Sequence, residues 1–290
     1  MPAISEASTG NAYKKLLNNV LVFLALLVVA RFVLEITGTP HAWTRYISSI
    51  AGLFLAAIYL AAIAPLKRGL LNYSQLILPA FLLPAWTVGW VILFTFISGA
   101  FRLERSYFAG PADFGNWGHL GHHILEHLVE IPILFLVVLV LMAFVHLLWR
   151  WPVTVGPGVL LGALVIMRYW FEAMKVPAST TAAFSSTVGI VLAAFYLGGV
   201  VPRLGQAGGR QLLVPALVLG WTWRLWVFIA TVMSAFPPFY RTHFFNRAGG
   251  HVAARLAGAL AGTVVEGLIA GLIVWGIAVW IASATREATD

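Results

Sequence analysis

The chain has 290 residues, of which 61% are hydrophobic and only 10% are charged. Soluble domains carry roughly 25% charged residues, so this chain has too little polar surface for a water-soluble fold. It contains no cysteine, which excludes disulfide bonds, thiolate metal sites and cysteine nucleophiles. Its net charge of +8 comes from basic residues scattered one or two to a loop, a pattern that suits membrane headgroups and excludes a nucleic-acid groove.

Eight apolar segments are long enough to cross a bilayer, which takes about 20 residues of helix. Helix breakers and charges separate them, and no stretch between them is long enough for a soluble domain. The sequence therefore predicts an all-α, polytopic integral membrane protein with about eight transmembrane helices. The predicted helices are Leu17–Ile36, Ile47–Leu66, Leu76–Phe101, Ile124–Trp149, Gly156–Ala173, Thr181–Val201, Leu212–Ala235 and Ala254–Ala282.

The sequence also repeats itself: the second half aligns with the first at a nearly constant shift, which shortens by one position in the later helices. Charged, proline and aromatic residues fall in register, which a shared apolar composition does not explain. We therefore predict two four-helix units, residues 1–150 and 151–290. The aligned pairs include Arg31 with Arg168, Glu35 with Glu172, Pro40 with Pro177, Trp90 with Trp226, Ser98 with Ser234, and Glu130 with Glu266.

Four helices to a unit is an even number, so both units should enter the membrane from the same side. Parallel repeats of this kind are related by a pseudo-twofold axis along the membrane normal, and substrate or ion sites often lie where the halves meet. The alternative is a fused ancestral dimer with no pathway at its centre. Lys14, Lys15, Lys67 and Arg68 flank the first hairpin and place the N-terminus inside, in what we expect to be a prokaryotic cytoplasmic membrane.

Charged residues inside the predicted helices are the first candidates for a site. A charge in hydrocarbon costs about 2.5 to 3.5 kcal/mol on insertion scales, so each one needs a partner or a watery cavity. The two Arg/Glu pairs have the i, i+4 spacing that allows pairing on one helix face. We expect all the paired charges to lie in the outer half of the membrane, with arginines of each first helix contacting glutamates of each fourth helix. The candidate residues are Arg31, Glu35, Glu130, Arg168, Glu172, Arg224 and Glu266.

These charges have two interpretations. They line a polar site for a small ion or solute, as in a transporter or channel-like protein, or they are structural salt bridges that fix helix packing.

A stripe of histidines is the second candidate site. Its residues share one face of a predicted helix with Glu130, and the i, i+3 His/Glu spacings are those of di-metal carboxylate bundles in reversed order. The stripe therefore predicts a metal site. A haem would need a further axial histidine, for which His146 and His251 are candidates. The alternatives are an amphipathic helix entry with hydrated imidazoles and a proton-titrating element. The stripe consists of His119, His122, His123, Glu126 and His127.

The fragment His119-x-x-His122-His123 resembles one histidine box of the membrane fatty acid desaturases and hydroxylases. That family needs several boxes, and the remaining histidines stand alone, so we exclude it. No zincin motif, phosphate-binding glycine loop or serine-nucleophile elbow appears. The leading functions are therefore a transporter or channel-like protein and a non-catalytic subunit that scaffolds a larger membrane complex. A metal- or haem-binding membrane oxidoreductase is the alternative that would use the histidines, and the expected partners are the lipid bilayer, a small ion or solute, and other membrane proteins.

Two further patterns concern packing. Gly258-x-x-x-Gly262 and Gly267-x-x-x-Gly271 in the last predicted helix indicate close helix–helix contact. Pro79 and Pro84 predict a kink in the third helix.

Overall fold

The computed structural model describes residues 6–44, 46–68, 73–202, 209–235, 242–245 and 252–287. These residues form helices joined by turns, with no strand among them. Eight helical stretches are long and apolar enough to cross a membrane, as the sequence predicts. The chain divides into two compact units, Met1–His146 and Leu147–Asp290. It has the build of a multi-pass membrane protein, because helices satisfy their own backbone hydrogen bonds in lipid.

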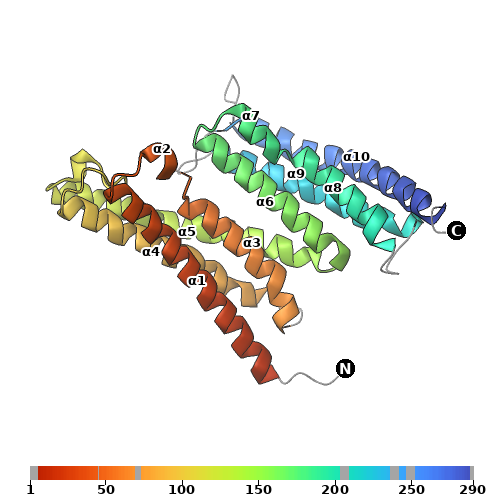
Figure 1. The fold of residues 1–290 in the computed structure, drawn as a ribbon, viewed down its shortest axis with the longest axis horizontal. Coiled ribbons are helices and arrows are strands. Elements are labelled where there is room, and N and C mark those ends of the chain that lie inside the picture. The colour runs from red at the N-terminus through yellow and green to blue at the C-terminus, as the bar shows by residue number, and fades with distance from the viewer. Residues whose placement is uncertain are drawn as a thin grey trace. The chain divides into compact units, whose positions relative to one another are not determined.

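The first unit contains four long helices (Figure 1). Helix α1 packs against α3 and α4. Leucine side chains from all four helices are fully buried at the centre of the unit, among them Leu24, Leu53, Leu83 and Leu134. The elements are α1 (Glu6–Ile36), α2 (His41–Thr44), α3 (Ser49–Arg68), α4 (Ser74–Ala100), the 3-10 turn η1 (Pro111–Asp113) and α5 (Trp117–Leu148).

The second unit follows a similar order of elements. Helix α6 packs against α8 and α9, and α10 runs beside α9, as the blue and cyan helices of Figure 1 show. A π-helical turn continues α8. The elements are η2 (Pro152–Thr154), α6 (Val155–Ala173), α7 (Ala178–Thr181), η3 (Ala182–Phe184), α8 (Ser186–Phe195), the π-turn η4 (Tyr196–Val200), η6 (Gly209–Leu212), α9 (Leu213–Ala235) and α10 (Val252–Glu287).

Helix α5 begins earlier than the sequence analysis expects. The predicted start was Ile124, whereas the helix starts at Trp117. The side-chain oxygen of Asn116 accepts a hydrogen bond from the backbone N–H of His119 at 3.2 Å, which caps the helix. Apolar composition misses these first turns because they are polar, and the histidine stripe therefore lies on a regular helix from its first residue.

Two prolines lie within α4. Pro79 and Pro84 each lack a backbone N–H donor, yet the helix runs unbroken from Ser74 to Ala100. The predicted kink at these residues stays a prediction.

The first helix of each unit ends in the same turn. Gly38 after α1 and Lys175 after α6 both have positive φ, 92° and 56°. The next N–H, from Thr39 or Val176, bonds back to a carbonyl five residues earlier at 2.9 Å in both units. This left-handed turn normally takes glycine, so Lys175 adopts a backbone conformation that glycine would adopt more easily.

Glycine also sets the contact between the first two long helices of each unit. A Cβ at Gly52 would lie 2.6 Å from a Leu27 methyl group, and one at Gly189 would lie 2.7 Å from a Leu161 methyl group. The two glycines align at the same shift that pairs Arg31 with Arg168. Each lets the helix that carries it approach its neighbour more closely than an alanine would.

The closest helix contact in the second unit joins α9 to α10. A Cβ at Gly220 would lie 2.3 Å from the Gly267 carbonyl oxygen and 2.4 Å from the Gly271 backbone nitrogen. The close packing predicted for Gly267-x-x-x-Gly271 is therefore confirmed. The space around Gly258, by contrast, is open.

The corresponding contact in the first unit is made by aromatic rings. Phe81 of α4 and Phe135 of α5 meet edge to face, with ring centres 6.1 Å apart. The shift that aligns Glu130 with Glu266 places Leu217 and Gly271 at the equivalent positions, where a Cβ on the glycine would lie 2.7 Å from the leucine Cα. Two phenyl rings therefore separate α4 from α5 at the point where α9 and α10 pack backbone to backbone.

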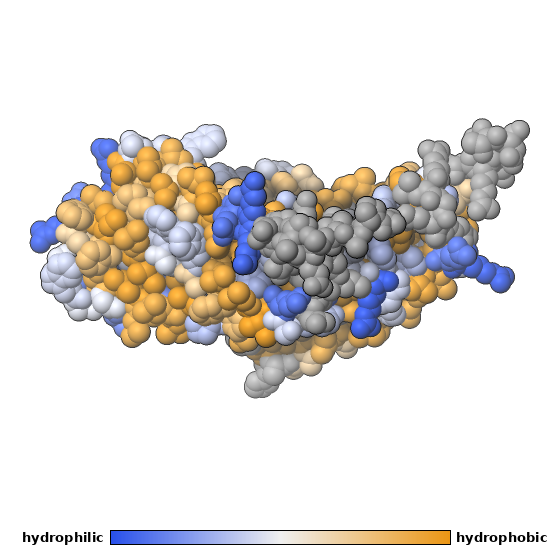
Figure 2. All heavy atoms as spheres, turned by 90° about the horizontal axis from the view of Figure 1, so that it is seen from below, coloured by the Kyte–Doolittle hydropathy of each residue, from blue (hydrophilic) through white to orange (hydrophobic). Residues whose placement is uncertain are grey.

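Hydrophobic side chains cover much of the described surface in Figure 2. Large apolar side chains are exposed on the long helices of both units, among them Leu26, Phe81, Leu136, Leu160 and Val264. Water would oppose so much exposed apolar surface, whereas lipid tails solvate it.

The close α9–α10 contact predicts that one added methyl group lowers the stability of the protein. Replacing Gly220 with alanine should lower the free energy of unfolding by about 1 to 3 kcal/mol, because the added Cβ would meet backbone atoms that cannot turn aside. Unfolding in mixed micelles with increasing SDS measures this change. Gly276→Ala on α10 is the matched control, since nothing lies within 4 Å of its Cβ position. Equal loss of stability in both variants would contradict the proposed packing.

Candidate functional site

A buried carboxylate ends the first helix of the first unit. Glu35 is 1% exposed. One of its oxygens accepts a hydrogen bond from Arg31 Nε at 2.9 Å, and the other accepts one from the backbone N–H of Tyr107 at 2.8 Å. The Arg31 guanidinium also lies over the Phe108 ring, 5.4 Å from its centre. We call Arg31, Glu35 and Tyr107 the first anchor, because the carboxylate ties α1 to the loop that follows α4.

The second unit has a more open version of this arrangement. Glu172 accepts a hydrogen bond from Arg168 Nε at 3.1 Å and one from the backbone N–H of His243 at 3.3 Å. The His243 imidazole contacts the same carboxylate through Nδ1. The Glu172 side chain is 15% exposed, against 0% for Glu35. We call Arg168, Glu172 and His243 the second anchor.

Hydroxyl groups fasten the same two loops to the third long helix of each unit. Ser98 of α4 bonds to the Ser106 hydroxyl at 2.7 Å. Ser234 of α9 bonds to the Thr242 hydroxyl, also at 2.7 Å. The sequence analysis aligned Ser98 with Ser234 but overlooked their partners, which lie in loops where no apolar pattern marks them. These hydroxyl contacts and both anchors lie at positions that the predicted repeat aligns.

The remaining glutamates lie far from the ends of their helices. Glu130 and Glu266 are close to the centres of the candidate spans Trp117–Leu148 and Ala254–Ala284, whereas Glu35 and Glu172 are each one residue from the end of theirs. That all the charges share the outer half of the membrane stays a prediction.

Among the described residues, the expected contacts between first-helix arginines and fourth-helix glutamates are not formed. Arg31 and Arg168 pair with glutamates of their own helices. Glu130 instead contacts His127, with Nδ1 to carboxylate oxygen at 3.1 Å. The glutamates at the ends of the spans, Glu35 and Glu172, thus have different partners from the mid-span glutamates, Glu130 and Glu266. The predicted convergence of both units' charges stays a prediction.

Glu266 has a partner on the neighbouring helix. Arg224 Nη2 of α9 lies 2.8 Å from a Glu266 oxygen, and the guanidinium also lies 5.5 Å from the Trp223 ring centre. The Arg224 side chain is 18% exposed and that of Glu266 is 54% exposed. Gly262 makes room for the pair, since a Cβ there would lie 3.1 Å from the carboxylate. This is an ion pair at mid-span whose acid reaches the surface of the unit.

The histidine stripe separates into three groups. His119 and His123 both turn Nδ1 toward Asp113, to different oxygens, at 2.6 and 3.1 Å. His127 pairs with Glu130 as described above. His122 and Glu126 lie 3.4 Å apart on the exposed side of the helix. The sequence analysis missed Asp113, a buried residue of the turn before α5.

Asp113 is held as a carboxylate. Burial raises its pKa, but hydrogen bonds from His119, from the Gly110 backbone N–H and from His123 outweigh burial and keep the pKa below its ordinary value. The Gly110 bond is 2.7 Å long. The result is a polar clamp between the α4–α5 loop and the first turns of α5.

The positions of the predicted metal and haem ligands limit which of them can bind one ion or one haem together. Within the described residues, no group of three or more His, Asp or Glu side chains is arranged to hold a metal ion. His146 follows His127 on α5 by more than five turns, about 28 Å along the helix, so these two cannot bind opposite faces of one haem. His251, the other haem candidate, lies outside the described residues.

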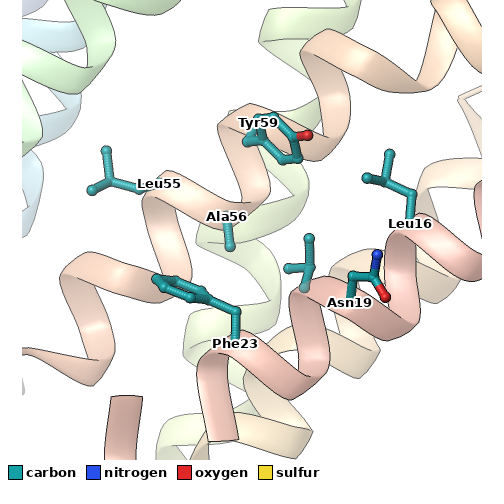
Figure 3. Close-up of a pocket in the computed structure, with 7 residues that line it drawn as sticks. Leu16, Asn19, Phe23, Leu55, Ala56 and Tyr59 are labelled. Atoms are coloured by element: carbon teal, nitrogen blue, oxygen red, sulfur yellow. The ribbon is translucent and has the colours of Figure 1, made fainter. Parts of the chain in front are cut away.

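An apolar cavity lies within the first unit. It has a volume of about 380 Å³ and lies between α1 and α3. Figure 3 shows Leu16, Asn19 and Phe23 of α1 facing Leu55, Ala56 and Tyr59 of α3 across it. Its lining is apolar apart from Asn19 and the Tyr59 hydroxyl, so it suits a hydrocarbon chain better than an ion.

No protein-family model, curated protein or solved structure matches this chain.

The two anchors give a paired prediction. Glu35→Gln should lower the free energy of unfolding by about 3 kcal/mol, since it leaves the Arg31 charge without a partner in a buried site. Glu172→Gln should cost less, because water reaches the second anchor. SDS-induced unfolding of both variants tests the order. A larger loss for Glu172→Gln would show that the second anchor is the stronger one.

The lowered pKa of Asp113 predicts that the α4–α5 loop loses its order in acid. Its pKa is lower in the folded chain than in the unfolded chain, so its contribution to stability is complete above about pH 4 and is lost as the pH falls through the folded value. Pepsin cleavage of the α4–α5 loop should therefore accelerate as the pH falls below about 4. Asp113→Asn should be cleaved readily at pH 4 and show a much weaker pH dependence. The same acid dependence in both proteins would assign the effect to other carboxylates.

Proposed function

We propose that this chain is a non-catalytic, membrane-embedded subunit that binds a transmembrane helix of a partner membrane protein. The observation that carries the proposal is the mid-span Glu266, whose side chain is 54% exposed beside Arg224. An exposed carboxylate at that depth is costly in lipid, so a polar group on another helix should cover it.

The surroundings of Glu266 support a helix as the occupant. Val265 and Ile269, next to Glu266 on α10, are 58% and 51% exposed. An apolar face with one carboxylate at its centre complements a helix that carries a basic or hydrogen-bond-donating side chain. Arg224 approaches one oxygen of Glu266, which leaves the other for the partner.

The remaining charges support a scaffold role. Each anchor binds a loop backbone N–H through a carboxylate that an arginine already neutralises. Such groups are engaged in holding helices and loops together. We further propose that the chain is a tandem repeat of one four-helix design. The recurrence of the anchors, the hydroxyl pairs, the left-handed turns and the glycine contacts at equivalent positions of the two units supports this.

Photo-crosslinking in native membranes tests the subunit proposal. A photoreactive residue at Ile269 should give one defined adduct, which Glu266→Lys should abolish by charge repulsion and Glu266→Gln should weaken. A photoreactive residue at the exposed Leu136 of α5 is the matched control. An Ile269 adduct of unchanged yield in Glu266→Lys, or a chain that remains a monomer without adducts, would refute the proposal.

Transport is the second candidate, favoured by the equivalent mid-span carboxylates of Glu130 and Glu266. Their partners differ, since Glu130 contacts His127 and Glu266 contacts Arg224. A chain that moves ions should lose that activity when either acid is made neutral.

Proteoliposomes with an imposed potassium gradient and a pH-sensitive dye measure proton flux directly. Wild-type protein should acidify or alkalinise the lumen faster than empty liposomes, and Glu130→Gln or Glu266→Gln should abolish the difference. Flux that is unchanged in both variants, or that never exceeds that of empty liposomes, would remove transport of protons through this site.

A further inference from the structure

Three histidines of α5 are spaced at i, i+4 and i+8, and each has Nδ1 against a carboxylate. His119 and His123 contact Asp113, and His127 contacts Glu130. A neutral imidazole that donates its Nδ1 proton to a carboxylate keeps Nε2 unprotonated, with its lone pair free. Carboxylates hold metal-binding histidines in this way, because the contact fixes the tautomer, orients the ring and raises its basicity.

His123 and His127 are the pair best placed to share an ion. Their ring centres are 5.0 Å apart. Two imidazoles bound through Nε2 to one tetrahedral zinc ion would have ring centres about 5 Å apart, given Zn–N bonds of about 2.0 to 2.1 Å. The two side chains are also the most shielded of the stripe, at 28% and 18% exposure, against 51% for His119 and 69% for His122.

The order of residues agrees with this geometry. Residues 123–127 read His-Ile-Leu-Glu-His, which is the reverse of the His-Glu-x-x-His order and matches the inverted zinc motif. The forward order does not occur in the sequence, so the absence of a zincin motif noted above holds only for that order. In such motifs the i, i+4 histidines bind the metal from one face of a helix.

We propose that His123 and His127 bind one divalent transition-metal ion, of the zinc or copper class, through their Nε2 atoms, with Asp113 and Glu130 as the groups that orient them. Because the described residues contain no three-ligand group, water fills the remaining coordination positions. The site belongs to the first unit alone, since Thr263 stands at the position equivalent to His127 and bonds to the Ala259 carbonyl of its own helix. It is independent of the partner-helix proposal, which concerns α10.

Metal titration of the full chain in detergent tests the site. Protein stripped with a chelator should bind one Zn²⁺ per chain, measured by competition with a chromophoric zinc indicator. His123→Gln and His127→Gln should each weaken binding at least tenfold, and Glu130→Ala about tenfold through loss of orientation. His122→Gln, which removes an exposed histidine of the same helix, should leave the affinity unchanged.

A spectroscopic readout separates a lost ligand from a lost fold. Cu²⁺ bound to the wild-type chain should give an electron paramagnetic resonance spectrum with splitting from two nitrogens, reduced to one in each single variant that elutes normally on size exclusion. The proposal is overturned if copper shows no nitrogen ligation, or if His122→Gln weakens zinc binding as much as His127→Gln does. Stoichiometric zinc binding that survives His123→Gln and His127→Gln together would also overturn it.

Discussion

Compensation of charge inside a low-dielectric layer is the constraint on which this structure depends. Every glutamate placed inside a candidate span has a basic or imidazole group within 3.4 Å in the part of the chain that the structure describes. The cost of an isolated charge in lipid explains why these contacts are formed within each unit, at the helix that carries the acid or at the next one. The surrounding apolar helices can then pack without leaving a bare charge.

The glutamates lie at two depths in the candidate spans, and their contacts differ between the two depths. At the membrane boundary, Glu35 and Glu172 each combine an arginine with a loop N–H, so the acid becomes a fixed point between a helix end and a loop. At mid-span, Glu130 and Glu266 have one partner each within the described part of the chain. A single partner leaves lone pairs unused, and this is why the mid-span acids carry both functional proposals.

The two units differ most in their last helix. Where the first unit has Phe81 against Phe135, the second has a glycine contact that brings α9 and α10 together. Close approach places Arg224 within reach of Glu266, whereas the residue equivalent to Arg224 in the first unit is Val88, which leaves Glu130 to His127. The residue on the third long helix and the spacing between the helices thus differ together with the base that contacts the equivalent acid.

The sequence by itself determined the helical class, the number of spans, the i, i+4 pairs Arg31–Glu35 and Arg168–Glu172, and the glycine contact of the last helix. These follow from local properties: apolar length, helical periodicity and residue size. The partners of Ser98, Glu266, His119 and His123 were decided only by the tertiary structure. Ser106, Asp113 and Arg224 come from loops or from another helix, and no period in the sequence links them to the residues they meet. A charge inside the membrane requires a partner, and the packing of the helices determines which residue that partner is.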